Sequence, residues 1–197
     1  MTHDLSILLV LRDIEPAVAG MVRDAQEIGA SLANGGGFEI LALDERSGDN
    51  TLAVLSILHA RVPELRTLQD LSRGSGVMQG TRVARGRRWL IVDHPVSAEL
   101  MRWAVVQLRD HGHPAAIVPG EVLAVEAGVG AAHLYELRGG LVSAQRAIER
   151  GLGRESRRAA WRPAPSRGCA ERALHFVRRR LSGISLNLRE RRSDRSR

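Results

Sequence analysis

The sequence of 197 residues has no lysine, one cysteine and few aromatic residues, and each shortage limits what the chain can be. All 29 basic residues are arginine, which we interpret as a GC-rich codon preference and not as a chemical requirement. The single cysteine, Cys169, excludes an internal disulfide. Because aromatic residues make up only 3% of the chain, any core must consist mainly of Leu, Val, Ile and Ala.

Long apolar segments are also missing. No run approaches the ~20 apolar residues that a membrane-spanning helix needs. The first residues read Met-Thr-His-Asp and lead directly into a strand-like segment, so we recognise no signal peptide. With 44% hydrophobic and 26% charged residues, the composition is that of a globular protein. We therefore expect a cytoplasmic location, with peripheral contact at the inner face of the membrane as an option.

Charge is distributed unevenly along the chain. Residues 1–137 contain 12 arginines against 17 acidic residues, a net charge of −5, whereas residues 138–197 contain 17 arginines against five, a net charge of +12. The basic excess therefore belongs to the C-terminal part and not to the segment with the strongest pattern of strands and helices.

Apolar segments alternate with helical patterns over the first 120 residues. Five short apolar runs are typical of strands buried on both faces: Leu5–Leu11, Phe38–Leu43, Leu65–Leu71, Trp89–Val92 and Ala115–Val118. Helical spacing separates them, as in the stripe from Val18 to Leu32 and in the segment Ala98–His111. Such alternation predicts a Rossmann-like three-layer α/β domain with a mostly parallel sheet, over residues 1–125.

The pattern changes after Gly130. Leu134 to Leu152 has the spacing of one amphipathic helix, and leucine, valine and isoleucine from Leu174 to Leu188 form a narrow helical seam. We predict a basic helical extension over residues 126–188 and a disordered basic tail over 189–197. The extension has three interpretations: a helix packed on the domain, a helix on an anionic membrane, or a contact with a protein or nucleic acid.

The strand ending at Leu43 is followed by an acidic signature. It reads Asp44-Glu45-Arg46-Ser47-Gly48-Asp49-Asn50-Thr51 and resembles the Asp-Asp-Gly-Ser-x-Asp-x-Thr motif of family-2 glycosyltransferases. Arg73-Gly74-Ser75-Gly76 and Ala84-Arg85-Gly86 resemble two further motifs of that family, in the same order. The resemblance covers residues 5 to about 120 and implies a GT-A nucleotide-diphospho-sugar domain of the dolichyl-phosphate mannosyltransferase-like type.

The resemblance also implies a set of ligand-binding residues. These would bind a nucleotide-sugar at the carboxyl ends of the strands: Asp13, Glu15, Asp44, Glu45, Arg73 and Asp93. Carboxylates there can accept hydrogen bonds from a base and a ribose. A divalent cation, Mg²⁺ or Mn²⁺, would neutralise the diphosphate, with Asp93 and His94 as its ligands.

Two departures from the family pattern affect the expected function. The metal-binding Asp-x-Asp reads Asp93-His94-Pro95, so the second carboxylate is replaced by proline. The half that carries the acceptor site and the catalytic base is not found after Gly120, so the resemblance is to a truncated family member. Catalytic residues and the acceptor are unknown, and Glu121 and Glu126 are the nearest carboxylates.

Three functions follow from these observations. The first is a family-2-like glycosyltransferase with a degenerate site. The second is a non-catalytic nucleotide-sugar-binding or scaffold protein. The third is an adaptor whose basic tail binds a membrane, a nucleic acid or a protein partner. Other site types are disfavoured, because no Gly-x-Ser-x-Gly motif surrounds a serine and His94, His111 and His113 lack metal-site spacing.

Overall fold

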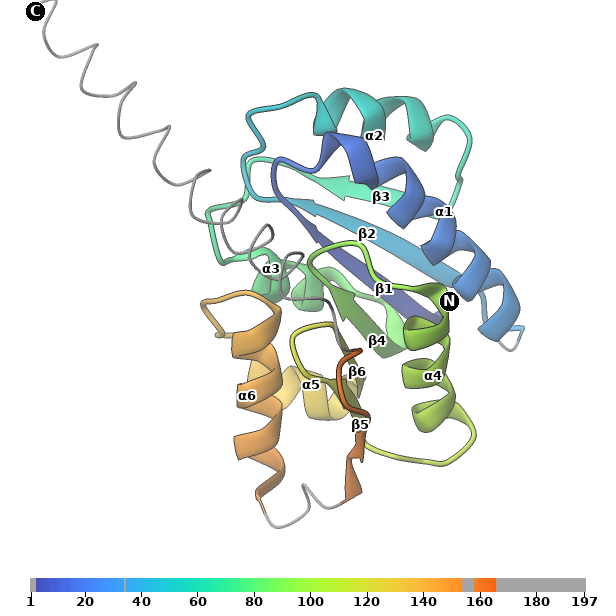
Figure 1. Cartoon of the computed structure of the whole chain (residues 1–197), viewed down its shortest axis with the longest axis vertical. Helices are drawn as coiled ribbons and strands as arrows, with labels where there is room; N and C mark the ends of the chain where they lie inside the picture. Colours follow the sequence, from blue (N-terminus) through green and yellow to red (C-terminus); the bar gives the residue numbers. More distant parts are fainter. Residues whose placement is uncertain (1–2, 34, 154–157, 166–197) are drawn as a thin grey trace, which may run out of the picture. The chain divides into compact units, whose positions relative to one another are not determined.

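A computed structural model of the chain describes residues 3–33, 35–153 and 158–165 (Figure 1). One compact unit runs from Met1 to Ala164 and contains every described residue except Pro165. Its strands are β1 (His3–Leu11), β2 (Phe38–Asp44), β3 (Leu65–Leu68), β4 (Gly86–Val92), β5 (Ala115–Val118), β6 (Val122–Glu126) and β7 (Ala160–Trp161). Its helices are α1 (Glu15–Leu32), α2 (Thr51–His59), α3 (Gly76–Val83), α4 (Ala98–Arg109), α5 (Ala127–Leu134) and α6 (Leu141–Leu152).

The strands form one sheet in the order β3-β2-β1-β4-β6-β5-β7. Strand β1 pairs in parallel with β2 on one side and with β4 on the other. Strand β6 is antiparallel to both of its neighbours, β4 and β5. The mostly parallel α/β sheet predicted from the sequence is therefore confirmed, with one reversed strand.

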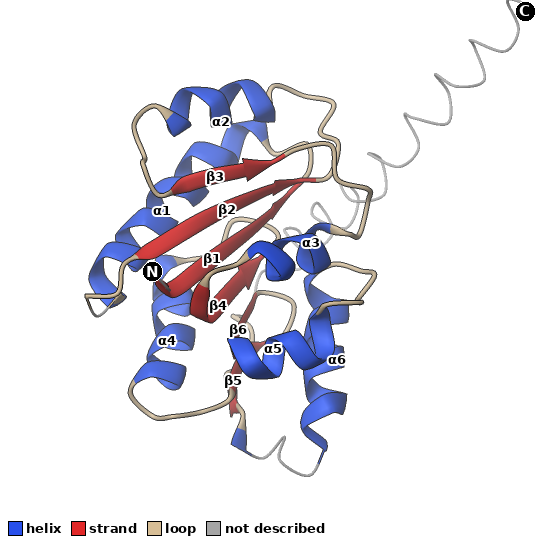
Figure 2. Ribbon diagram, turned by 180° about the vertical axis from the view of Figure 1, so that it is seen from behind, coloured by secondary structure: helices blue, strands red, loops and turns tan. Residues whose placement is uncertain are grey.

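Helices cover both faces of this sheet, as Figure 2 shows. One buried cluster joins α1, α2 and α4 to side chains such as Ile7 and Leu9 of β1. A second cluster joins α3, α5 and α6 to the opposite face, including Leu8 of β1 and Trp89 of β4. Because neighbouring residues of a strand point to opposite faces, the apolar run of β1 contributes to both clusters.

Strand β6 was not predicted. The segment Val122–Glu126 is short and follows the turn Pro119-Gly120-Glu121 directly, so it makes a hairpin with β5 and not another strand–helix unit. A helical repeat between two strands indicates a parallel crossover. The sequence has no such repeat between β5 and this segment.

The prediction of a single helix from Leu134 to Leu152 is wrong. Two helices, α5 and α6, are separated by residues 135–140, where Gly139 has a positive φ of 146°. Both helices bury apolar side chains in the cluster beneath the sheet, among them Leu134, Leu141 and Ile148. Both helices belong to the compact unit that runs from Met1 to Ala164.

The C-terminal basic segment lies outside the described residues. The predicted helical seam from Leu174 to Leu188 and the predicted disordered tail over 189–197 both belong to it. Within the described part of the chain, no helix combines the length and the apolar character needed to cross a bilayer.

Candidate functional site

The sheet register brings the predicted acidic residues to one edge. Asp44 is level with Leu11 across the β1–β2 pair, and Val92 is level with Leu9 across the β1–β4 pair. Asp44 and Asp93 therefore lie on the two strands that flank β1, at its carboxyl end. With a strand spacing of about 4.8 Å, their Cα atoms are roughly 10 Å apart.

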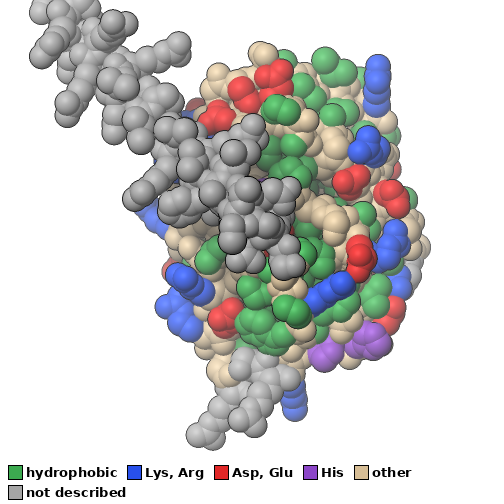
Figure 3. Space-filling model, viewed as in Figure 1, with side chains coloured by type: hydrophobic (Ala, Val, Ile, Leu, Met, Phe, Trp, Pro, Cys, Tyr) green, Lys and Arg blue, Asp and Glu red, His purple; other side chains and the backbone are tan. Residues whose placement is uncertain are grey.

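The loops that follow β1 and β2 are joined by carboxylate hydrogen bonds. Asp13 Oδ1 accepts from the Gly48 amide at 2.6 Å, and Glu15 accepts from the amide and side chain of Asn50, both at 3.3 Å. Asp49 Oδ2 accepts in turn from the Glu15 amide at 2.9 Å. Figure 3 shows acidic side chains gathered over the first turns of α1 and α2. These carboxylates fix the shape of the edge.

Asp49 binds the first residue of α2. Its Oδ1 accepts from the Thr51 amide at 3.0 Å and from the Thr51 hydroxyl at 2.6 Å. Burial alone would raise the pKa of Asp49, but the Thr51 hydroxyl and the amides of Glu15, Thr51 and Asp49 outweigh it, so the pKa is lowered. The lowered pKa favours the ionised form of Asp49, whose two oxygens bind the Glu15 amide and Thr51.

Glu45 is a support for the neighbouring turn. Its Oε2 accepts from the Gly74 amide at 2.9 Å and its Oε1 from the Gly76 amide at 2.8 Å. The carboxylate, which is 7% exposed, thus binds the start of α3, where amides and the helix dipole favour negative charge. The predicted ligand residue Arg73 lies in this turn and is exposed. Glu45 positions Arg73, and both of its own oxygens are engaged.

Asp44 is fully buried, and one of its two carboxylate oxygens has a hydrogen-bond donor. Its Oδ2 accepts from the Ser47 amide at 3.2 Å. No donor among the described residues lies within hydrogen-bond distance of its Oδ1. An unpaired buried carboxylate oxygen costs free energy, and such atoms need an explanation when they occur at the edge of a sheet where ligands bind.

Backbone strain collects at the same edge. Within the described residues, three residues other than glycine have a positive φ: Asp13 at 49°, Arg46 at 57° and Asp70 at 60°. They follow β1, β2 and β3 respectively. The Arg46 side chain is 64% exposed and forms an ion pair with Asp70 at 2.8 Å. The left-handed backbone of Arg46 is one that glycine adopts without strain.

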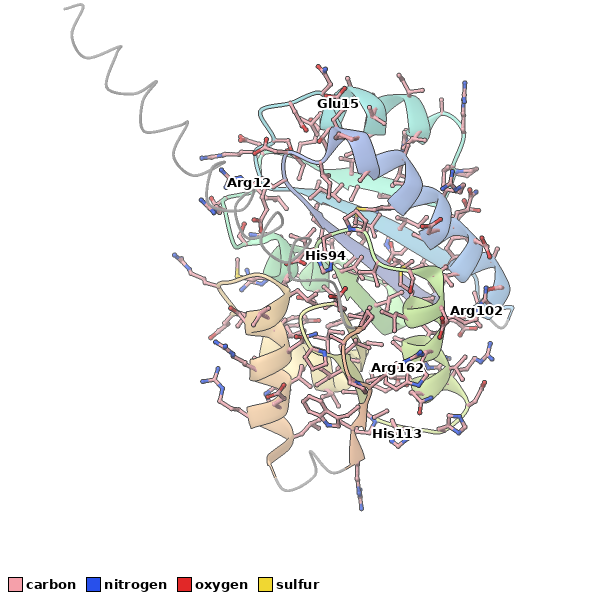
Figure 4. The ribbon with its side chains drawn as sticks, in the orientation of Figure 1. Arg12, Glu15, His94, Arg102, His113 and Arg162 are labelled. Atoms are coloured by element: carbon pink, nitrogen blue, oxygen red, sulfur yellow. The ribbon has the colours of Figure 1, made fainter. Side chains whose placement is uncertain are left out.

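The end of β4 carries a buried histidine between two carboxylates. His94 Nδ1 lies 2.7 Å from Asp93 Oδ1, and His94 Nε2 lies 3.1 Å from Glu121 Oε2. The histidine is 4% exposed, and the side chains of both carboxylates are 10% exposed. Figure 4 shows His94 in the loop beyond β4. Asp93, His94 and Glu121 thus form one buried cluster.

The two carboxylates determine the charge of the ring. Burial alone would lower the pKa of His94, but hydrogen bonds with Asp93 and Glu121 and the charges of both outweigh it, so the pKa is raised. A neutral imidazole has one N–H, whereas a protonated ring donates from both nitrogens. The arrangement therefore favours the imidazolium form.

Helix α6 holds Glu121 in place through Gln145, which is 3% exposed. The Gln145 side-chain amide donates to the carbonyls of Val118 and Val122, and its oxygen accepts from the Gly120 amide, each at 2.9 Å. Gly120 has a positive φ of 73°, so the turn uses a conformation that glycine adopts readily. Gln145 was not predicted from the sequence, because the sequence of an amphipathic helix does not show which backbone groups a polar side chain will bind.

The donor set at β4 does not fit a divalent cation. Both nitrogens of His94 face carboxylates, one of Asp93 and one of Glu121. Among the described residues, no group of three or more His, Cys, Asp or Glu side chains is arranged to hold a metal ion. Figure 4 also shows His113 far from His94, so the histidines do not combine. The predicted metal ligands Asp93 and His94 are hydrogen-bonded to each other.

Comparisons with known proteins identify the fold. The chain is similar to a mannosyltransferase from Pyrobaculum calidifontis in complex with GDP-Man and Mn²⁺, at a TM-score of 0.61 and 15% identity over 94% of this chain and 65% of that one. A glucosyl-3-phosphoglycerate synthase from Mycobacterium tuberculosis with Mn²⁺, UDP-Glc and phosphoglyceric acid matches at a TM-score of 0.58 and 13% identity, over 87% and 75%. The fold is that of the GT-A glycosyltransferases.

Further comparisons show how much of the related proteins this chain covers. S. aureus TarS in complex with UDP matches at a TM-score of 0.56 and 12% identity, over 75% of this chain and 54% of TarS. No protein-family model and no curated protein matches the sequence. The chain spans 65% of the mannosyltransferase and 54% of TarS, so a substantial part of those proteins has no counterpart in it.

Proposed function

We propose that this chain binds a nucleoside-diphosphate sugar at the carboxyl ends of β1, β2 and β4, as a family-2-like glycosyltransferase with an altered metal motif. The observation that carries the proposal is the buried Oδ1 of Asp44, which has no donor among the described residues. It lies beside three strained residues at the edge where open α/β sheets bind ligands.

Asp44 and Arg73 are the residues to which we assign ligand contacts. A base or a ribose offers N–H and O–H donors, which would satisfy Asp44 Oδ1. The exposed guanidinium of Arg73 suits a diphosphate, because its planar set of donors matches phosphate oxygens. Asp13, Glu15 and Glu45 then act by positioning, since their oxygens hold the surrounding backbone.

A non-catalytic binding or scaffold protein is the second candidate. It is favoured by the same network, because most predicted ligand residues are engaged within the protein. The two functions differ in turnover. Release of UDP or GDP from a nucleotide-sugar, measured with the full chain, supports the enzyme, whereas binding without release supports the scaffold. The proposed partner or membrane contact of residues 166–197 stays a prediction.

The binding proposal is tested by thermal unfolding with UDP and GDP. A ligand at 100 times its Kd adds about 2.7 kcal/mol to the free energy of unfolding. For a chain of this size, that raises Tm by roughly 5–10 °C. We expect such a rise, and we expect Asp44→Asn to remove most of it, because the amide cannot accept at both positions.

Asp110→Asn is the matched control. Asp110 follows α4, away from the strand ends that carry Asp44, and its pKa is lowered by a hydrogen bond from Arg109, so it is also an ionised carboxylate. Its variant should keep the full nucleotide-induced rise. If neither UDP nor GDP raises Tm at millimolar concentration, with or without Mn²⁺, the proposal is wrong.

A further inference from the structure

Two turns, each with an arginine followed by a glycine, meet beside the proposed binding edge. Arg73-Gly74 lies before α3, and Arg138-Gly139 lies in the loop between α5 and α6. The Gly139 amide donates a hydrogen bond to the Gly74 carbonyl at 2.7 Å. Figure 1 shows this loop beside the start of α3. The contact therefore places Arg73 and Arg138 on adjacent turns.

The close approach of the two turns depends on glycine. Gly74 has a positive φ of 74° and Gly139 one of 146°, conformations that glycine adopts readily. A Cβ atom on Gly74 would lie 3.5 Å from the Cα atom and the nitrogen of Gly139, and one on Gly139 would overlap the side chain of Ser143. Larger residues would therefore disturb the contact that sets the spacing of the two arginines.

The first turn is tied to the strand ends that carry the proposed ligand residues. The Leu71 amide donates to the Asp44 carbonyl at 3.0 Å. Glu45 then accepts from the amides of Gly74 and Gly76 at 2.9 and 2.8 Å. Arg73 is therefore presented next to Asp44 by a turn whose backbone is held on both sides.

The second turn is anchored at its other end by α3 and β4. Arg82 Nε donates to the Tyr135 carbonyl at 2.9 Å. The rings of Trp89 and Tyr135 are stacked, with their centroids 6.2 Å apart. With Tyr135 held at its start and Gly139 near its end, the loop fixes the backbone of Arg138.

The guanidinium groups of both arginines are available to a ligand. Arg73 and Arg138 are exposed, and neither side chain has a hydrogen bond or an ion pair with another described residue. Glu45 is occupied by backbone amides, and Glu136, an exposed acidic residue of the same loop, forms no ion pair with either arginine. Two neighbouring guanidinium groups repel each other unless an anion lies between them. Their planar donor sets match phosphate oxygens.

From this geometry we propose that Arg73 and Arg138 form one site for a diphosphate group, with Arg138 as its second phosphate ligand. The inference rests on the proposed function, in which the diphosphate is that of the nucleotide-sugar. It assigns a ligand contact to the loop after α5, which lies beyond residue 120, where the sequence resemblance ends. Each guanidinium then donates charge-assisted hydrogen bonds to the phosphate oxygens.

The proposal is tested by isothermal titration calorimetry of the full chain with UDP, uridine and inorganic pyrophosphate, in buffer that contains EDTA. We expect Arg138→Gln to weaken the binding of UDP and of pyrophosphate at least about tenfold, because hydrogen bonds from a charged donor are lost. The affinity for uridine, which has no phosphate, should not change. Arg138→Lys keeps the charge without the planar donor set, so its affinity for UDP should be intermediate.

Arg87→Gln is the matched control. Arg87 is also exposed, but it lies in the first turnless residues of β4, at the opposite end of the strand from Asp93. Its variant should bind UDP and pyrophosphate as the wild type does. Gly139→Ala keeps both arginines and disturbs only their spacing, so it should weaken pyrophosphate binding as well.

Unchanged affinities for UDP and pyrophosphate in Arg138→Gln, or an equal loss in Arg87→Gln, would overturn the inference. A wild type that binds neither compound in EDTA would overturn it too, whereas a UDP-induced rise in Tm with Mn²⁺ that Asp44→Asn removes would still support the proposed function. Conversely, pyrophosphate binding that Arg138→Gln removes supports the arginine site even in a chain that UDP and GDP do not stabilise, and that chain contradicts the proposed function.

Discussion

The two halves of the strand-end edge use their carboxylates in opposite ways. Beyond β1 and β2, Asp13, Glu15, Glu45 and Asp49 accept hydrogen bonds mainly from backbone amides. Beyond β4, Asp93 and Glu121 face the His94 imidazole. An amide cannot lose its proton in the physiological range, whereas an imidazole can. The first half therefore has a fixed charge, and the second has a charge that changes with pH.

The first half should carry the larger share of stability, and Glu45→Ala is the strongest way to test it. The change leaves two backbone amides without their charged acceptor, and each such bond contributes about 1.5–3 kcal/mol. We expect a loss of roughly 3–5 kcal/mol in the free energy of unfolding, measured by urea denaturation.

Two further variants sharpen this result. Glu45→Gln keeps one acceptor oxygen and should lose about half as much. Glu136→Ala removes an exposed glutamate and should change stability by less than about 0.5 kcal/mol. A Glu45→Ala protein as stable as Glu136→Ala would show that the two amide contacts contribute nothing.

The second half should respond to pH, because the pKa of His94 is raised in the folded protein. A raised folded pKa means that the contribution to stability is complete below the unfolded value of about 6.5 and is lost as pH rises through the folded pKa. We expect the free energy of unfolding of the wild type to fall over that interval, and Glu121→Gln to flatten the fall by removing one of the two charges on the ring.

Urea denaturation at a series of pH values measures this effect. His94→Asn removes the titrating group and should remove the same part of the pH dependence, so it is the reference for Glu121→Gln. Identical profiles for wild type and His94→Asn would mean that the cluster does not couple protonation to folding.

The smallest effect on stability is expected at Arg46, in the loop between β2 and α2. Arg46 has a left-handed backbone and an exposed ion pair with Asp70. Arg46→Gly relieves the backbone strain but loses that pair and makes the unfolded chain more flexible, so we expect a change within about 1 kcal/mol. Arg46→Val should instead lower Tm, because a β-branched residue tolerates a positive φ poorly. Equal Tm values for the two variants would exclude strain at this position.

The sequence predicts the sheet well where a strand is an unbroken apolar run. The run Leu5–Leu11 matches β1 closely, because every residue in it except Ser6 is apolar and both faces of the strand are buried. Val122–Glu126 is also mainly apolar, but no helix separates a hairpin strand from its neighbour. A prediction based on alternating strands and helices therefore misses it. Its direction depends on pairing with β4, which is a tertiary contact.

The sequence predicts where the site lies, but not which residues form hydrogen bonds with one another there. Asp44 and Asp93 end strands, and that fact alone brings them to one edge. Nothing near Glu45 in the sequence shows that its partners are the amides of Gly74 and Gly76, about 30 residues later. Glu121 is likewise separated from His94 by a whole helix and strand. Partner choice depends on packing, which the local pattern does not record.

The reversed direction of β6 has one more consequence. Because β5 and β6 are joined by a tight turn, the position of the Glu121 carboxylate depends on the length of the loop Pro119-Gly120-Glu121. One residue inserted there would slide the hairpin tip away from the imidazole and leave β1 to β4 undisturbed. The length of this loop thus determines whether Glu121 can contact His94.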